Sequence, residues 1–249
     1  MNPTEHADYL NDLADKHQAR LAKALAKLER TASQYLTTAP LNDGELFDLE
    51  WALASRVTLR QMIRDEYLVP VNKMITEYND VVASSYSMID ELSAGKFTRL
   101  DPNVVSQLQQ LQFQGFNHIG DEYLDIIAQQ IYQSTLTGAS VQSGIEFIQR
   151  TVSGRLGRYA KQQMHDGLMQ FNASINVNIG KASGAKKWKY YGGRIAETRE
   201  HCLKHIGKVY TEEEIKQKWK GDWAGKAEGD PFVVRGGYNC RHHWGPVFD

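Results

Sequence analysis

Apolar side chains recur every three or four positions along most of residues 1–180, which is the spacing of one face of an α-helix. The first stripe follows Asn2-Pro3-Thr4-Glu5, a sequence suited to cap and start a helix. It continues to about residue 36 through Leu10, Ala14, His17, Leu21, Ala24, Leu28 and Tyr35. We therefore predict a long first helix, and its regularity makes it a candidate for self-association with a second copy of the chain.

Similar stripes predict further helices over residues 46–63, 74–92 and 104–127. Pro70 should end or kink the helix before it, because proline lacks a backbone N–H and clashes with the preceding turn. For every stripe we expect helix-on-helix packing in preference to a cofactor site.

A last long helical pattern covers residues 145–171 and follows Ser140, which is a suitable N-cap. Gly154 and Gly157 lie inside this pattern. Because glycine weakens a helix interior, an unbroken helix is not expected there.

The last 69 residues differ in composition from the rest of the chain. Residues 181–249 hold four of the five tryptophans, both cysteines and half of the glycines. Alternation over 187–190 and 207–211 predicts short strands, and Thr211-Glu212-Glu213-Glu214 is a capping box for a helix to about Trp219. The aromatic side chains expected to form a small core are Trp188, Tyr190, Tyr191, Trp219, Trp223, Tyr238 and Trp244.

The predicted fold is therefore mainly α, with an elongated multi-helix N-terminal body over residues 1–180 and a small α+β C-terminal module over residues 181–249. Residues 180–185 are glycine-rich and form a plausible connector between the two. Below, "the module" means residues 181–249.

The charge distribution and the lack of membrane or secretion signals exclude few classes of function. The body carries 15 Lys and Arg against 21 Asp and Glu, whereas the module carries 14 against 9, so the module could face nucleic acid or an acidic protein. No apolar run approaches the roughly 18 residues of a membrane span. The N-terminus lacks the features of a secretory signal, so we expect a cytosolic origin, and two cysteines do not make a disulfide scaffold.

Two short segments of the module combine Cys, His, Arg and Gly. Residues 198–210 read TREHCLKHIGKVY, and residues 236–246 read GGYNCRHHWGP, with Asp230-Pro231-Phe232 shortly before them. Together they resemble the C-terminal module of the Mu F-like (head morphogenesis) family of phage minor head proteins. The resemblance covers about residues 188–249 and extends loosely over the helical segment 141–178.

The residues that carry this resemblance, or that support it structurally, are Arg199, Cys202, His205, Gly207, Gly237, Asn239, Cys240, Arg241, His242 and Trp244. The resemblance implies a virion structural protein of low copy number, associated with the portal or the capsid interior. It would act in head morphogenesis, DNA packaging or genome delivery, and it would be assembled in the bacterial host cytoplasm. Its implied partners are portal and capsid proteins, with packaged DNA as a further candidate.

The thiol and imidazole groups suggest a metal site. Cys202-x-x-His205 and Cys240-x-His242 each place two ligands at close spacing, and four such groups could close a tetrahedral Zn²⁺ site. His243 or His201 could replace one ligand. A disulfide between the cysteines and ordinary buried packing remain alternatives. In each case we expect Cys202 and Cys240 to lie close together.

Arg199 and Arg241 flank the two cysteines in sequence. We expect them to form structural ion pairs with Glu197, Glu200 or Asp230, in preference to pointing outward toward phosphate.

No complete catalytic constellation is present, so we expect no enzymatic activity. The alternatives are a metal-dependent nuclease built on Asn239, His242 and His243, or an effector-type enzyme carried in the virion. For a nuclease centre, Asn239, His242 and His243 lie too close together in sequence, and no acidic cluster is available to bind Mg²⁺. A Cys202–His205 nucleophilic pair would lack a third group to orient the histidine.

Overall fold

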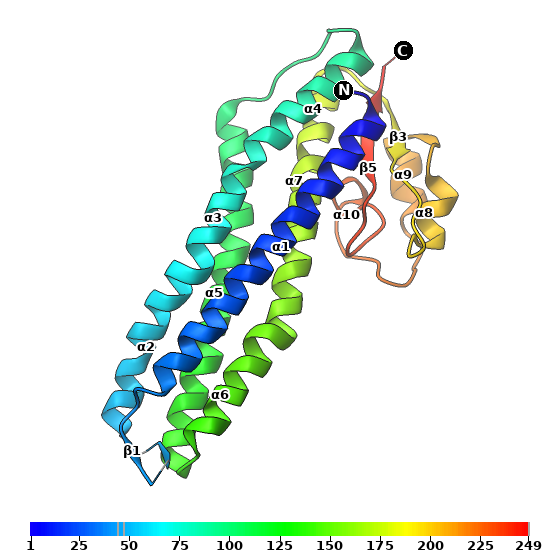
Figure 1. Ribbon diagram of the computed structural model, residues 1–249. Coiled ribbons are helices and arrows are strands. Elements are labelled where there is room, and N and C mark those ends of the chain that lie inside the picture. Colours follow the sequence, from blue (N-terminus) through cyan, green and yellow to red (C-terminus); the bar gives the residue numbers. More distant parts are fainter. Residues whose placement is uncertain (44, 47, 249) are drawn as a thin grey trace. The chain divides into compact units, whose positions relative to one another are not determined.

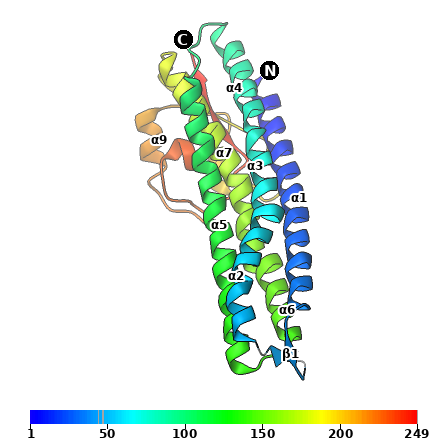
Figure 2. The same cartoon turned by 90° about the vertical axis from the view of Figure 1, so that its left-hand side faces the viewer.

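The computed structural model describes residues 1–43, 45–46 and 48–248, and these fall into two compact units. The terminal unit comprises Met1–Lys16, Thr76–Gln112 and Met164–Asp249, and the middle unit comprises His17–Ile75 and Phe113–Gln163. Each unit is built largely of helices that run side by side (Figures 1 and 2).

The helices of the first 182 residues follow the predicted stripes closely. They are α1 (Pro3–Leu36), α2 (Leu49–Ile63), α3 (Val69–Thr76), α4 (Tyr78–Ser93), α5 (Pro102–Thr137), α6 (Val141–Gln149) and α7 (Leu156–Ala182). The predicted cap of α1 is present, because the Glu5 N–H donates to the Asn2 side chain and the Asn2 N–H donates to the Glu5 carboxylate, both at 2.9 Å. Ser140 caps α6 by accepting from the Ser143 N–H.

Two expected interruptions take different forms. Pro70 is the second residue of α3. The chain before it is not regular α-helix, because α2 ends at Ile63 and the π-helical segment η1 (Arg64–Leu68) follows directly. Of the two glycines expected to weaken the last helix, Gly154 has a non-helical backbone within the π-helical segment η2 (Arg150–Arg155), between α6 and α7. Gly157 lies inside α7.

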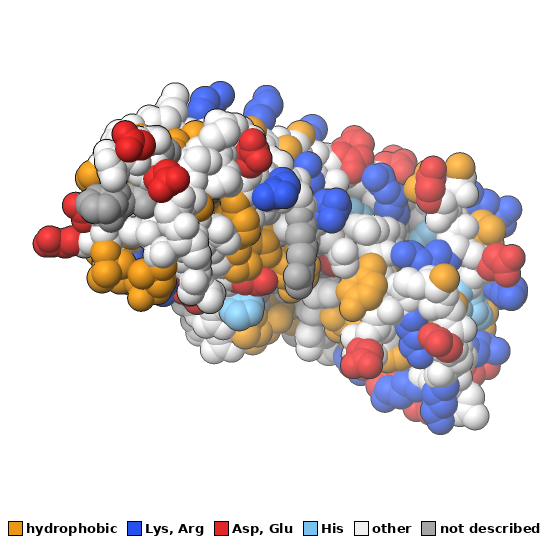
Figure 3. Space-filling view, turned by 90° about the horizontal axis from the view of Figure 1, so that it is seen from below, with side chains coloured by type: hydrophobic (Ala, Val, Ile, Leu, Met, Phe, Trp, Pro, Cys, Tyr) orange, Lys and Arg blue, Asp and Glu red, His pale blue; other side chains and the backbone are white. Residues whose placement is uncertain are grey.

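The middle unit has its own apolar core and a small hairpin, β1 (Leu41–Asn42) with β2 (Glu45–Leu46), so Leu46 belongs to a strand and α2 begins three residues later than predicted. The largest buried side chains of this unit include Leu21, Tyr67, Phe116 and Tyr123. Three residues on one face of α2, Leu49, Leu53 and Val57, are exposed. Figure 3 shows hydrophobic side chains reaching the surface beside charged ones.

The module lies wholly within the terminal unit and contains a three-stranded antiparallel sheet in the order β4-β3-β5. The strands are β3 (Lys187–Tyr191), β4 (Val209–Thr211) and β5 (His243–Val247). Trp188 pairs with Tyr210 on one side and Pro246 on the other, and Tyr190 pairs with Trp244. The helices are α8 (Glu200–His205), α9 (Glu212–Lys218) and α10 (Pro231–Val234).

The mainly α fold with a small α+β module is confirmed, as are β3, β4 and the Thr211 capping box of α9. Sequence analysis missed β5, because Gly245-Pro246 breaks the alternation typical of strands. Proline is tolerated there because β5 is an edge strand.

Residues 180–185 form the end of α7 and its turn. The Ala185 N–H donates to the Gly180 carbonyl at 2.9 Å, and Gly184 has a φ of 85°, as in a left-handed helix cap. The compact units divide the chain elsewhere, so independence of residues 1–180 from 181–249 stays a prediction. Within the described residues, no helix is long and apolar enough to cross a membrane.

Candidate metal centre

The module is built around aromatic side chains, as its composition predicted. Trp188, Tyr190, Trp219 and Trp244 are buried, and Trp223 packs against the edge of the same cluster. Tyr238 was expected in this core, but it is 48% exposed. The two cysteines are part of this buried cluster.

Three potential metal ligands meet at the centre of the module. Cys202 comes from α8, whereas Cys240 and His242 come from the segment between α10 and β5. All three are buried, and their ligand atoms lie within 4.8 Å of one another. Both thiols are free, so the disulfide alternative is not the state of this structure. The predicted proximity of Cys202 and Cys240 is confirmed, and this cluster could hold a metal ion.

The ring of His242 is oriented for ligation by a hydrogen bond on its far side. Its Nε2 lies 3.1 Å from the Gly193 carbonyl oxygen, which can only accept, so Nε2 carries the proton. In the neutral imidazole, Nδ1 then presents its lone pair toward Cys240 Sγ, 3.5 Å away. Metal-binding histidines commonly use a backbone carbonyl in this way to fix the tautomer.

Gly236 allows the backbone to approach both sulfurs. Its N–H donates to Cys240 Sγ at 3.2 Å. A Cβ on Gly236 would overlap Cys202 Sγ and lie 2.9 Å from Cys240 Sγ. The position therefore requires glycine for steric reasons.

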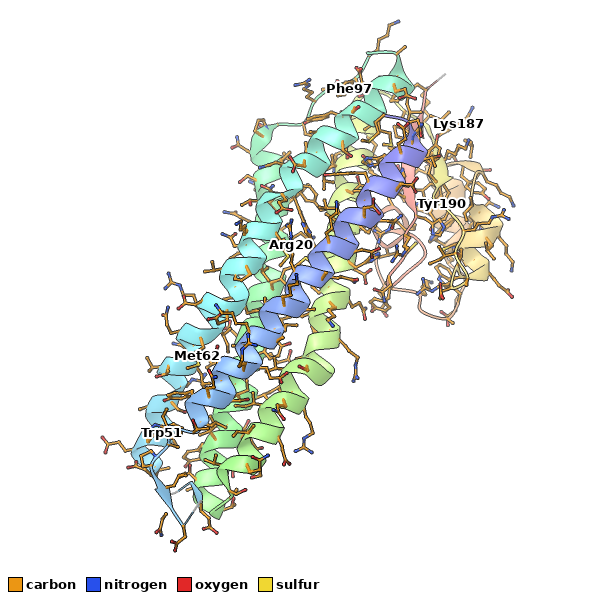
Figure 4. The ribbon with its side chains drawn as sticks, viewed as in Figure 1. Arg20, Trp51, Met62, Phe97, Lys187 and Tyr190 are labelled. Carbon is orange, nitrogen blue, oxygen red and sulfur yellow. The ribbon has the colours of Figure 1, made fainter. Side chains whose placement is uncertain are left out.

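Tyr190 contacts the same sulfurs from the sheet. Tyr190 lies on β3 (Figure 4). Its side chain is fully buried. The hydroxyl lies 3.6 Å from Cys202 Sγ and 3.4 Å from Cys240 Sγ. Its ring stacks on His242 with centroids 5.3 Å apart, so one tyrosine touches all three candidate ligands.

The two thiols differ in acidity. Burial by itself would raise the pKa of Cys240, but the hydrogen bond with Cys202, together with the positive charge of Arg235, outweighs it and holds that pKa well below its ordinary value. The hydrogen bond with Cys240, and then burial, raise the pKa of Cys202. A bound cation would take both sulfurs as thiolates and so displace any thiol proton.

His205, predicted as the fourth ligand, lies outside the cluster. Its Nδ1 is 2.8 Å from the Tyr210 hydroxyl, and its ring contacts Trp219. His201, predicted as a possible replacement ligand, stacks on Trp223 with ring centroids 3.7 Å apart. Burial is the largest cause that lowers the pKa of both histidines to about 4. Aromatic neighbours, which the Cys-x-x-His spacing does not reveal, thus hold these two rings.

The two arginines brace loops around the centre, but with partners other than the predicted carboxylates. Arg199 donates to the backbone carbonyls of Ala224 and Tyr238, at 3.0 and 2.5 Å. Arg241 pairs with Asp15 of α1 at 3.0 Å. A structural role was expected, but Asp15 lies too far away in sequence to be identified from spacing.

The remaining motif residues shape the backbone near the ligands. Gly207 and Gly237 have φ values of 79° and 102°. The Asn239 N–H donates to the Asp166 carboxylate at 2.7 Å, and the Trp244 indole donates to the Pro231 carbonyl at 3.2 Å. Sequence analysis missed the roles of Tyr190 and Gly193 at the cluster.

A cavity of about 260 Å³ opens beside the cluster, and all three candidate ligands line it. Its other walls are mainly polar and include Glu197, Thr198, Arg199, Asn239 and Arg241. The arrangement is thus a soft Cys₂His ligand set with access to a polar cavity.

His243 does not belong to this cavity. It is 1% exposed, its ring stacks on Tyr191 at 5.6 Å and meets His6 edge-on at 5.2 Å, and neither ring nitrogen has a hydrogen-bond partner among the described residues. The geometry therefore gives no support to a nuclease centre that pairs His242 with His243.

Comparison of the chain with protein-family models, with curated proteins and with solved structures found no significant match.

Proposed function

We propose that the module binds one Zn²⁺ through Cys202, Cys240 and His242. One observation carries this proposal: the motifs at residues 198–210 and 236–246 converge on a single buried Cys₂His cluster, in which the Gly193 carbonyl fixes the imidazole tautomer. Two thiolates and one imidazole suit Zn²⁺ better than the oxygen-seeking Mg²⁺ or Ca²⁺. The role of this ion is to stabilise the module, because a structural metal contributes its binding free energy to folding.

We further propose that the whole protein is a bacteriophage minor head protein, acting at the portal or capsid interior in head morphogenesis, DNA packaging or genome delivery. The proposal rests on the resemblance of the module's two motifs to the Mu F-like family. Among the positions that carry the resemblance, Cys202, Cys240 and His242 form the cluster. Arg199 and Arg241 brace loops around it, whereas His205 lies outside it. A compact module attached to long helices suits an assembly role better than catalysis.

Contact with packaged DNA rests on the resemblance alone, as does contact with portal or capsid proteins. On the face that Figure 3 shows, basic side chains are interspersed with acidic ones and do not form one broad basic patch. Nonspecific DNA binding depends on such a patch, because affinity comes from neutralised phosphates.

The zinc proposal is tested by measuring the metal content of the purified full chain by mass spectrometry. We expect one zinc per chain, with zinc lost from C202S and C240S and bound at least tenfold more weakly by H242Q. The matched control is H205Q, which should retain the metal because His205 faces Tyr210. Metal loss in H205Q together with retention in C240S would overturn the proposed ligand set.

The virion proposal is tested by quantitative mass spectrometry of heads purified from the phage or prophage that carries the gene. We expect the protein in fewer copies than the major capsid protein, and we expect crosslinks to portal or capsid subunits. Absence from both procapsids and mature particles would remove the virion role.

A further inference from the structure

The cavity beside the Cys₂His cluster bears on how the coordination of a bound ion is completed. We infer that the metal keeps one coordination position open to this cavity, where water or a small anion binds and exchanges. This inference rests on the proposed zinc site and concerns its fourth ligand.

Three protein side chains are placed to bind the ion. Among the described His, Cys, Asp and Glu side chains, the group that includes Cys202 and Cys240 has one further member, His242. The expected fourth ligand, His205, is held by Tyr210. Zinc is normally at least four-coordinate, and sites with three protein ligands complete the shell with water or another exogenous ligand.

The open coordination position faces the cavity, because the other side of the cluster is covered by protein. Tyr190 and the backbone of Gly236 cover the sulfurs from the protein interior, and neither lines the cavity. The three ligands all line the cavity, so their common free side faces it. A space of about 260 Å³ has room for several water molecules or a small anion.

The charges around the cavity set the class of ligand. Zn²⁺ with two thiolates and a neutral imidazole has no net charge, so its open position takes water readily. Arg199 lines the cavity and donates to carbonyl oxygens that carry no formal charge, so its positive charge favours an anion there. Glu197 on the same wall opposes it. The fitting ligand is therefore water or a compact monovalent anion.

The test uses the full chain loaded with Co²⁺, whose visible absorption reports its coordination shell, and sodium azide as the probe. We expect azide to change the cobalt spectrum in a saturable way. E197Q, which removes the opposing charge at an exposed position, should tighten azide binding by roughly twofold to fivefold.

Two variants separate the possible failures. H205Q should leave both the cobalt spectrum and the azide response in place, because His205 faces Tyr210 and lies outside the cluster. A cobalt spectrum that does not respond to azide in the wild-type chain would overturn the open position while leaving the metal site standing. A wild-type chain that binds cobalt no better than C202S would overturn both the metal site and this inference.

Discussion

At the scale of single residues, the candidate metal centre depends on a glycine, Gly236, because any side chain at this position would collide with the sulfurs. Gly236 sits against both sulfurs and donates its N–H to Cys240. A methyl group there has no space, because its neighbours are the buried thiols and the Tyr190 hydroxyl, 3.3 Å away. The two ligand-bearing segments therefore approach each other through backbone in addition to side chains.

G236A should weaken zinc binding at least tenfold and destabilise the chain by about 1–3 kcal/mol, since overpacking forces buried groups apart. Chelator competition and urea unfolding measure the two effects. The matched control is G221A, because an added Cβ at Gly221 meets no atom within 4 Å. Equal zinc affinity in G236A and G221A would show that the sulfurs do not approach this backbone.

At the scale of elements, a buried polar network joins three helices of the terminal unit. His6 of α1 contacts Ser84 of α4 at 2.5 Å and Asn172 of α7 at 2.8 Å. The Asn172 oxygen accepts from His6 Nε2, so a neutral ring with Nδ1 accepting from Ser84 satisfies every bond. Burial lowers the pKa of His6 to about 4, and the nearby N-terminal ammonium and His243 ring add no negative charge to oppose this.

This network predicts acid sensitivity. Between pH 6.5 and about 4 the unfolded chain binds a proton at His6 that the folded chain does not, so the free energy of unfolding falls as the pH falls. The contribution of His6 is on the order of 3 kcal/mol. H6Q removes the titrating group, so its unfolding free energy, measured in urea across this window, should vary less with pH than that of the wild type.

The exposed His118 offers the matched control, H118Q, because it lies outside the network. A parallel pH dependence of H6Q and the wild type would contradict the assignment of the acid sensitivity to His6.

At the scale of the whole molecule, the module shares one compact unit with helical segments from distant parts of the chain. Arg241 pairs with Asp15, the Asn239 N–H binds Asp166, and a Cβ on Gly245 would reach Leu92 of α4. The surfaces on α1, α4 and α7 thus support the segment that holds Cys240 and His242. Composition alone suggested a boundary near residue 180, but it could not show these contacts.

Residues 181–249 expressed alone should therefore be less stable than the same residues in the full chain. We expect the zinc-loaded fragment to unfold at a Tm at least roughly 10 °C lower, equivalent to the loss of a few kcal/mol in a domain of this size. Calorimetry of the fragment and of the full chain measures this difference. A fragment with the Tm of the full chain would instead support the predicted boundary.

Local patterns in the sequence determined much of the fold. Apolar spacing predicted the helices, and the side chains of Asn2, Ser140 and Thr211 cap the helices that they were expected to cap, because capping depends on neighbours within a few residues. The clustering of tryptophans also located the small core. The motifs further predicted that Cys202 and Cys240 meet, since a small module has to bring its densest segments together.

The tertiary structure alone decided which groups complete the site. His201 and His205 both lie within three residues of Cys202, yet Trp223 and Tyr210 hold their rings. His242 is instead turned toward the sulfurs by the Gly193 carbonyl. Ligand choice therefore depends on side chains that are distant in sequence. Pairings such as Arg241 with Asp15 follow from how helices and strands pack, because spacing along the chain constrains only neighbours within a turn or a hairpin.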